Sequence, residues 1–173
     1  MSRIFIFAFV LFATLFAVNA APLEKRKTSF PLCHGLPPDT VGLDVKMTPD
    51  PFVPGQKVTF DIKGTMKYDI FIDDFFGIVF FDLVEKHPIG NPLIVDTCIL
   101  PGVNCTVKAG TAISTTVDYL APGAKELPKS YAIIIAISHG NEPLVITLAC
   151  SIAIFGASKL PAVPADLDFW GFL

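Results

Sequence analysis

The sequence predicts an all-β, immunoglobulin-like β-sandwich of about seven strands, and three observations carry this prediction. Apolar and polar residues alternate with a period of two in several segments, which is the pattern of half-buried strands. Turn signals rich in proline and glycine recur between these segments, and no segment keeps a 3.6-residue apolar period over a window of about eleven residues. Apolar residues make up 52% of the chain and charged residues 17%, so the chain has enough apolar surface for a large core.

The first half of the chain alternates predicted strands with rigid connections. Residues 43–48 and 58–63 place apolar side chains at every second position and predict two strands. The Pro-rich segment 49–55 between them predicts a fixed connector, because proline does not donate a backbone hydrogen bond and does not fit a central strand. A longer apolar segment, 70–84, predicts a strand whose core, 75–81, is apolar on both faces.

The second half continues this pattern. The remaining predicted elements, in chain order, are a loop marked by Pro88, Gly90 and Pro92, a short strand at 93–95, and strands at 113–119, 131–137 and 144–154. Gly140-Asn141 is the predicted hairpin turn before the last strand. In that strand, a regular alternation would place Leu144, Ile146, Leu148, Cys150, Ile152 and Ile154 on one face.

The first 20 residues have the features of a signal peptide. Arg3 gives a positive start, an apolar run extends from Ile4 to Val18, and a small residue, Ala20, stands at the predicted cleavage position. A second cut is predicted after the dibasic pair Lys25-Arg26. The predicted organisation is a signal peptide at 1–20, a propeptide at 21–26, one domain at 27–158 and a C-terminal extension at 159–173. We therefore expect a protein of the secretory pathway, located outside the cell or in the lumen of a vacuole or endosome.

Secretion places the four cysteines in an oxidising compartment, where an even number favours disulfides. Four cysteines allow three pairings. The simplest is nested, with Cys33–Cys150 joining the two ends of the patterned region and Cys98–Cys105 closing a loop. Zinc is the weaker interpretation, since no Cys-x-x-Cys spacing is present. Asn104 begins a glycosylation sequon, although a disulfide at Cys105 disfavours its modification.

Composition and motifs argue against several function classes. The formal net charge of −3 disfavours nucleic-acid binding, which needs clustered Lys and Arg. There is no Gly-x-Ser-x-Gly nucleophile elbow, and His34, His87 and His139 each stand alone in a loop-like context. Adjacent strand positions would direct Asp73 and Asp74 to opposite faces, so we expect edge charges that discourage aggregation rather than one ion site. The sequence therefore predicts neither an enzyme nor a metal or cofactor site.

The apolar surplus has two interpretations. The chain contains 16 Phe against 3 Tyr and 1 Trp, which suits a thoroughly apolar interior. An ordinary sandwich closes its sheets at about 10 Å and leaves no room between them, so a filled core accounts for this composition. Alternatively, the sheets splay and the surplus lines a pocket for an acyl chain or sterol. Composition leaves both open, and the first corresponds to a secreted recognition module without cargo.

A set of ordered motifs resembles the ML (MD-2-related lipid-recognition) domain. The motifs are Cys33, Pro49-Asp50-Pro51-Phe52-Val53-Pro54-Gly55-Gln56, Asp96-Thr97-Cys98, Asn104-Cys105, Leu127-Pro128-Lys129-Ser130-Tyr131 and Cys150. They are most similar to the fungal phosphatidylglycerol/phosphatidylinositol transfer proteins, relatives of the Niemann–Pick lysosomal sterol carrier. The resemblance runs from Cys33 to Phe155, nearly the whole predicted domain. It departs from the family at Thr106, where members commonly carry proline.

The resemblance implies a sandwich with a lipid between its sheets and the nested disulfide pairing. By analogy, the protein extracts a phospholipid or sterol from one bilayer, shields its tails and releases it to another, as a monomer in transient contact with membranes. The predicted lining is the set of inward-parity residues Val58, Phe60, Ile62, Phe76, Ile78, Phe80, Tyr131, Ile133, Ile135, Leu148 and Ile152. The parity of 75–81 is ambiguous, so Phe75, Val79 and Phe81 are the alternative set there. The loop around Cys105 and the aromatic tail at 169–172 are the predicted membrane contacts.

Overall fold

The computed structural model describes residues 27–140 and 145–156. The predicted signal peptide, propeptide and C-terminal extension, together with Asn141 of the predicted hairpin turn and Leu144 of the predicted last strand, lie outside the described residues. The elements, in chain order, are β1 Asp44–Thr48, β2 Lys57–Thr65, β3 Phe75–Asp82, β4 Pro88–Asp96, the 3₁₀ turn η1 Thr97–Ile99, β5 Ala112–Leu120, β6 Tyr131–His139 and β7 Ile146–Phe155. Within this part of the chain, no helix is long and apolar enough to cross a membrane.

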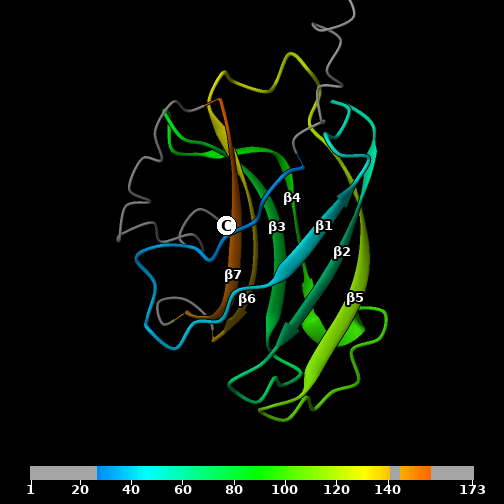
Figure 1. Cartoon of the computed structure of the whole chain (residues 1–173), viewed down its shortest axis with the longest axis vertical. Helices are drawn as coiled ribbons and strands as arrows, with labels where there is room; N and C mark the ends of the chain where they lie inside the picture. The colour runs from blue at the N-terminus through cyan, green and yellow to red at the C-terminus, as the bar shows by residue number, and fades with distance from the viewer. Residues whose placement is uncertain (1–26, 141–144, 157–173) are drawn as a thin grey trace, which may run out of the picture.

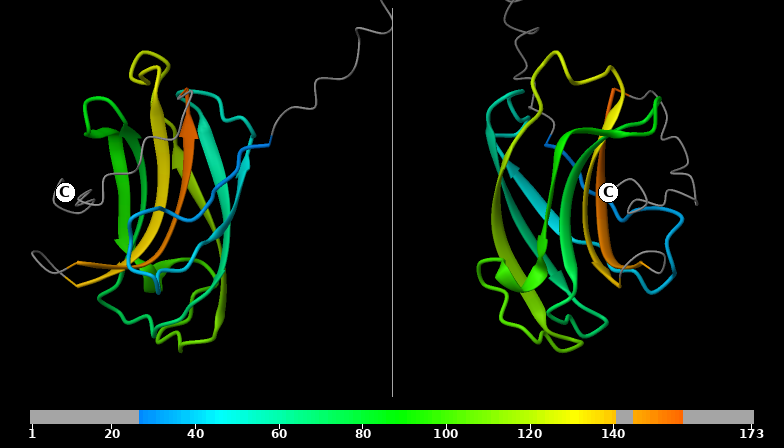
Figure 2. Two further views of the ribbon diagram at one scale, coloured as in Figure 1. Left: turned by 60° about the vertical axis from the view of Figure 1, so that its left-hand side comes forward. Right: turned by 180° about the vertical axis from the view of Figure 1, so that it is seen from behind.

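The strands form two antiparallel sheets that face each other (Figures 1 and 2). One sheet has three strands in the order β1-β2-β5, and the other has four in the order β4-β3-β6-β7. In β2 and β5 every second residue is buried, as expected where one face meets the core and the other meets solvent. The prediction of an immunoglobulin-like sandwich is therefore confirmed.

The predicted loop at 88–92 is wrong, because β4 already begins at Pro88. β4 is an edge strand, where a proline without an N–H group breaks no central ladder. Its register against β3 shifts between the pairs Ile78–Leu93 and Phe80–Ile89, which places extra β4 residues in a bulge. Gly90 lies in this bulge with a φ of +68°, a conformation that favours glycine. Proline and glycine therefore mark an irregular edge here rather than the absence of a strand.

The predicted single face of the last strand is also wrong. The register between β6 and β7 shifts between Ile137 and Ser138, and Leu148 is the extra residue of this bulge. One extra residue reverses the side-chain parity beyond it. Leu148 consequently joins the core between the sheets, whereas Cys150 and Ile152 belong to a second cluster on the opposite face.

This second cluster explains why 75–81 is apolar on both faces. Phe76, Ile78 and Phe80 face the three-stranded sheet, whereas Phe81 packs on the outer face of its own sheet. The outer face is covered by the N-terminal segment, whose Cys33 and Leu36 pack there. Backbone bridges pair Leu32 with Ser151 and Val41 with Ala149, so this segment runs beside β7 (Figure 2).

The nested disulfide pairing is confirmed. Cys33–Cys150 spans 117 residues and fastens the N-terminal segment to β7, and Cys98–Cys105 spans 7 residues and closes the loop after β4. In the chain-entropy model a disulfide stabilises by restricting the unfolded chain, and the effect grows with the enclosed loop. The two bonds therefore differ in their expected contributions.

We expect the double variant Cys33→Ser, Cys150→Ser to lose about 5 kcal/mol of unfolding free energy and Cys98→Ser, Cys105→Ser about 2.5 kcal/mol. Urea unfolding monitored by circular dichroism measures both differences. Equal losses in the two variants would contradict the loop-length account.

Candidate functional site

The predicted lining residues come together, with one exception. Ten of the eleven lie in or against one cluster between the sheets, namely Val58, Phe60, Ile62, Phe76, Ile78, Phe80, Tyr131, Ile133, Ile135 and Leu148. The exception is Ile152, which the β7 bulge turns to the outer face. For the ambiguous run, the inward set is Phe76, Ile78 and Phe80, which pair across the strands with Ile137, Ile135 and Ile133.

The interior is closed in this structure. Phe60, Phe76, Phe80, Ile133 and Ile135 are all 0% exposed, so no water-sized space reaches these side chains. Packing of this kind is typical of an ordinary sandwich core. A ligand between the sheets therefore requires these side chains to move apart.

Aromatic rings gather at the end of the interior that lies uppermost in Figure 1. Phe52, from the predicted rigid connector, inserts there and makes edge contacts with Phe80 at 5.4 Å and Phe155 at 6.0 Å. Phe80 stacks on Tyr119 at 5.4 Å, and Tyr131 stacks on Phe155 at 4.9 Å. The connector thus closes this end with an apolar ring, a role that its proline content did not reveal.

The two tyrosines of this aromatic cluster bring polar groups to the upper end. Burial raises the pKa of Tyr119 above its usual range, and the nearby carboxylate of Glu126 adds to the shift. Burial also raises the pKa of Tyr131. Both phenols therefore stay neutral and keep their hydroxyl hydrogens at physiological pH, and that of Tyr119 donates to the carbonyl of Asn91 at 2.8 Å.

A threonine of β5 also faces the apolar interior. Thr115 is buried on the same strand face as Ile113 and Val117, and its hydroxyl has no hydrogen-bond partner among the described residues. An unsatisfied buried hydroxyl destabilises the folded state by about 1–3 kcal/mol. The alternation of 113–119 identifies the inward face, but the missing partner is visible only in the structure.

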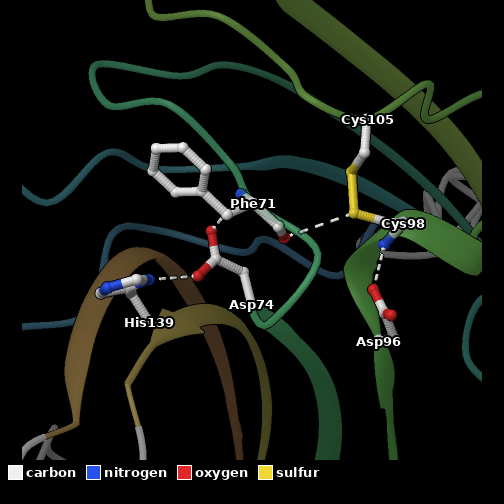
Figure 3. The surroundings of a disulfide bond; sticks show 6 residues. All are labelled: Phe71, Asp74, Asp96, Cys98, Cys105 and His139. Atoms are coloured by element: carbon white, nitrogen blue, oxygen red, sulfur yellow. Dashed lines mark hydrogen bonds and ion pairs between the residues drawn. A yellow bond between two sulfur atoms is a disulfide. The ribbon is translucent and has the colours of Figure 1, made fainter.

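The opposite, lower end of the sandwich contains a buried carboxylate that contacts a half-exposed histidine. Asp74 is fully buried; its carboxylate accepts a hydrogen bond from the Phe71 N–H at 2.8 Å and contacts His139 Nδ1 at 2.5 Å (Figure 3). The backbone carbonyl of Asp74 also accepts from Thr97 N–H, and Cys98 Sγ contacts the Phe71 carbonyl. Asp74 therefore joins β3, β6 and the disulfide loop.

This arrangement corrects two predictions. Asp74 is not an edge charge but a buried one, because residues 71–74 form a turn that directs its side chain inward rather than a strand. Neither His139 nor His87 stands alone, since His139 pairs with Asp74 and His87 with Glu85. Partners that lie 65 residues apart, as Asp74 and His139 do, leave no local sequence signal.

A hollow of about 360 Å³ lies beside His139. Its walls include Tyr68, Phe71, His139, Ile146 and Leu148. Tyr68 and Phe71 are each 45% exposed and Ile146 is 54% exposed, whereas Leu148 belongs to the closed core. The hollow thus connects an exposed apolar rim with the edge of the interior.

Comparison with solved structures identifies the fold. The chain is similar to a Niemann-Pick type C2 protein from the Japanese carpenter ant, with 18% identity and a TM-score of 0.51 over 73% of this chain and 96% of that chain. It also matches chicken MD-1 in its complex with lipid IVa, with 15% identity and a TM-score of 0.40 over 65% of this chain and 80% of that chain. No model of a known protein family and no curated protein matches the sequence.

The protein thus shares the two-sheet sandwich fold of a Niemann-Pick type C2 protein, which is the fold that the sequence resemblance implies.

We expect Thr115→Val to raise the free energy of unfolding by about 1 kcal/mol, because valine has nearly the same shape and removes the unsatisfied hydroxyl. The matched control is Thr116→Val on the outer face of the same strand, where the hydroxyl bonds to Asp61 at 2.8 Å. The control should be neutral or slightly destabilising. Chemical unfolding of both variants tests this, and a destabilised Thr115→Val protein would show that the hydroxyl is satisfied in solution.

Proposed function

We propose that this protein binds a lipid between its two sheets and carries it from one membrane to another. The main supporting observation is that the facing surfaces of the two sheets are almost entirely apolar, from Val45 of β1 to Leu148 of β7. The two sheets share no strand, so side-chain packing is the main contact between them across the interior. Such an interface can separate without breaking a strand ladder.

The cargo we propose is a phospholipid, phosphatidylglycerol or phosphatidylinositol, or a sterol. This follows from the resemblance of the connector, the disulfide loop and the last strand to the fungal transfer proteins. Burial of an alkyl chain contributes about 0.8 kcal/mol per CH₂ group. The affinity can therefore come from the tail, while a polar headgroup stays at the opening.

In this proposal, the structure with the closed interior is the lipid-free form of the protein. A tail entering between the sheets would replace contacts among residues such as Phe80, Ile133 and Ile135 with contacts to itself. The contacts that these side chains lose with one another and the contacts that they gain with the tail are both apolar. The exchange therefore costs little free energy beyond the separation of the sheets. The orphan hydroxyl of Thr115 would offer one hydrogen bond to a polar atom of the cargo.

The lower hollow is the proposed entrance. It borders the interior at Leu148, and its lining combines the exposed apolar side chains of Phe71 and Ile146 with the carboxylates of Asp39 and Asp69. Ile72 and Ile99, each 68% exposed, extend the apolar rim toward the disulfide loop. This rim would contact the bilayer during loading and release.

The proposed site of action is the lumen of the secretory or vacuolar system or the cell exterior, in keeping with the two disulfides.

A recognition module with a filled core is the second candidate. It is favoured by one observation, the absence of water-accessible surface on the inner residues such as Phe60 and Phe76. In this case the apolar rim of the lower hollow would contact a protein rather than a membrane.

Native mass spectrometry of the secreted protein, with lipid extraction from the same sample, distinguishes the two. A stoichiometric phospholipid or sterol supports the carrier proposal and identifies the cargo class. A bare mass that persists after incubation with liposomes containing phosphatidylglycerol, phosphatidylinositol and ergosterol would reject it in favour of the recognition module.

Two adjacent phenylalanines of β3 provide a matched pair of variants. Phe80 faces the interior and Phe81 the outer cluster, and both are buried. Each Phe→Leu change should cost about 1 kcal/mol of stability through a similar change in packing. We expect Phe80→Leu to shift the bound lipids toward bulkier chains, because it enlarges the cargo space, and Phe81→Leu to leave the lipid profile unchanged.

Lipid extraction with chain-length analysis measures the effect, and circular dichroism confirms that both variants fold. The same lipid profile in both variants would place the cargo outside the interior.

A further inference from the structure

Two threonines at one edge of the sandwich have buried hydroxyl groups without a hydrogen-bond partner. Thr97 is 0% exposed and Thr115 is 4% exposed, and neither hydroxyl bonds to any of the described residues. A hydroxyl buried in this way destabilises the folded state, and native interiors contain few of them. Two such groups in one interior therefore indicate a role other than stabilising the lipid-free fold.

Both hydroxyls face the space between the sheets. Thr115 shares the buried face of β5 with Val117. On the other sheet, Val95 of β4 packs against the same core, and Thr97 continues this alternation two residues further along the chain. A third hydroxyl without a partner, that of Ser138, follows an inward-facing isoleucine of β6 and so belongs to the outer face.

The two threonines lie on opposite sheets at the same edge of the interior. β4 and β5 are both edge strands, and a side-chain hydrogen bond from β5 to the backbone of β4 joins them. The loop that follows Thr97 also approaches β5 closely, since a Cβ atom on Gly102 would lie 2.7 Å from the Ser114 carbonyl oxygen. Thr115 is the next residue of β5. An atom inserted between the sheets at this edge would therefore meet both hydroxyls.

The fold fixes the backbone of each threonine and leaves the hydroxyl free. The Thr97 N–H donates to the Asp74 carbonyl at 2.8 Å, and the Thr97 carbonyl accepts from the Leu100 N–H at 3.3 Å. Thr115 lies opposite Ile62 in the ladder between β2 and β5. Each hydroxyl can consequently donate to a third group without any change in the backbone.

That third group must be uncharged. In the part of the chain that the structure describes, no lysine, arginine or histidine is buried. A phosphate or carboxylate between the sheets would lack a counter-charge there, which is very unfavourable. A hydroxyl or ester carbonyl oxygen, in contrast, has two lone pairs and can accept one hydrogen bond from each threonine.

We propose that Thr97 and Thr115 form an internal polar subsite for one uncharged oxygen of the cargo, either the hydroxyl of a sterol or an ester carbonyl of a diacyl phospholipid. This inference rests on the proposed function, because only a cargo between the sheets reaches these two hydroxyls. The hydroxyls lower the stability of the lipid-free protein and gain their partner when the cargo binds. The subsite thereby selects for lipids that place an oxygen inside the sandwich and fixes how deeply they insert.

The test compares matched pairs of lipids that differ in this oxygen. One pair is cholestanol and cholestane, which lacks the hydroxyl. The other is a diester phosphatidylglycerol and its diether analogue, which has the same headgroup but no ester carbonyl. Each lipid is offered in vesicles of diether phosphatidylcholine, and the lipid bound to the protein is extracted and measured by mass spectrometry.

We expect the wild type to prefer the oxygen-bearing member of one pair by about tenfold, and that pair identifies the source of the oxygen. Thr97→Val and Thr115→Val should each reduce this preference to less than about threefold while raising the Tm of the lipid-free protein. The control, Thr116→Val on the outer face of β5, should keep the preference. Thr97→Ser, which retains the hydroxyl, should keep it as well. A threonine with a purely structural role would not change lipid preference and Tm in opposite directions.

Two outcomes would overturn the subsite and leave the carrier function intact. One is a wild type that takes up lipid but binds both members of each pair equally, which would assign the two hydroxyls to an enclosed water only. The other is a preference that persists in both valine variants. A wild type that takes up none of the four lipids would instead reject the proposed function, and this inference with it. Circular dichroism confirms folding, and Thr115→Val carries the test alone where Thr97→Val does not fold.

Discussion

The apolar character of the four-stranded sheet on both of its faces determines how the rest of the molecule is arranged. The inner residues Ile133, Ile135 and Ile137 must pack against one part of the chain to be shielded from water, and the outer residues Ile134 and Ile152 must pack against another. The three-stranded sheet provides the first. The N-terminal segment contributes to the second, and the Cys33–Cys150 disulfide and backbone bridges fasten it to β7. The disulfide and the double-sided sheet are therefore parts of one structural arrangement.

Much of the fold could be predicted because strand alternation is a local signal. The burial of β2 and β5 follows the sequence residue by residue, and the parity of β6 correctly places Ile133 and Ile135 inward. The errors occur where one residue is added to a strand. The extra residue at Leu148 reverses the parity of β7, and the bulge around Gly90 makes an edge strand look like a loop. A bulge depends on the partner strand, so a single strand's pattern does not reveal it.

Contacts between distant residues account for the rest of what the sequence did not show. Asp74 reaches His139 across 65 residues, and Phe52 reaches Phe155 from a connector that reads as rigid loop. Thr115 follows the correct alternation, yet only the surrounding structure shows that its hydroxyl lacks a partner. Asp74 and His139 lie at the lower end, where a ligand would enter, and Phe52 and Phe155 lie at the upper end, where it would stop. Thr115 lies between them, where a polar atom of the ligand would be recognised.

The two long edges of the sandwich are joined by different kinds of interaction. At the β1–β7 edge, the hydroxyl of Ser151 accepts from Leu43 N–H at 2.8 Å and donates to the Leu43 carbonyl at 2.9 Å, next to the disulfide of the adjacent Cys150. At the β4–β5 edge, the side-chain link is the hydrogen bond from Tyr119 to the carbonyl of Asn91.

This difference bears on how a lipid would be admitted. Covalent and backbone links resist separation more strongly than one phenol hydrogen bond, which contributes about 1 kcal/mol. Sheets that separate around a tail would therefore pivot at the β1–β7 edge and widen toward β4 and β5, so the cargo space would extend away from the lower hollow, which β7 residues line. The bulged edge strand β4 is also the strand that can bend with the least loss of ladder hydrogen bonds, because it has a neighbour on one side only. The irregularity that hid β4 in the sequence is thus a property that an opening sandwich would use.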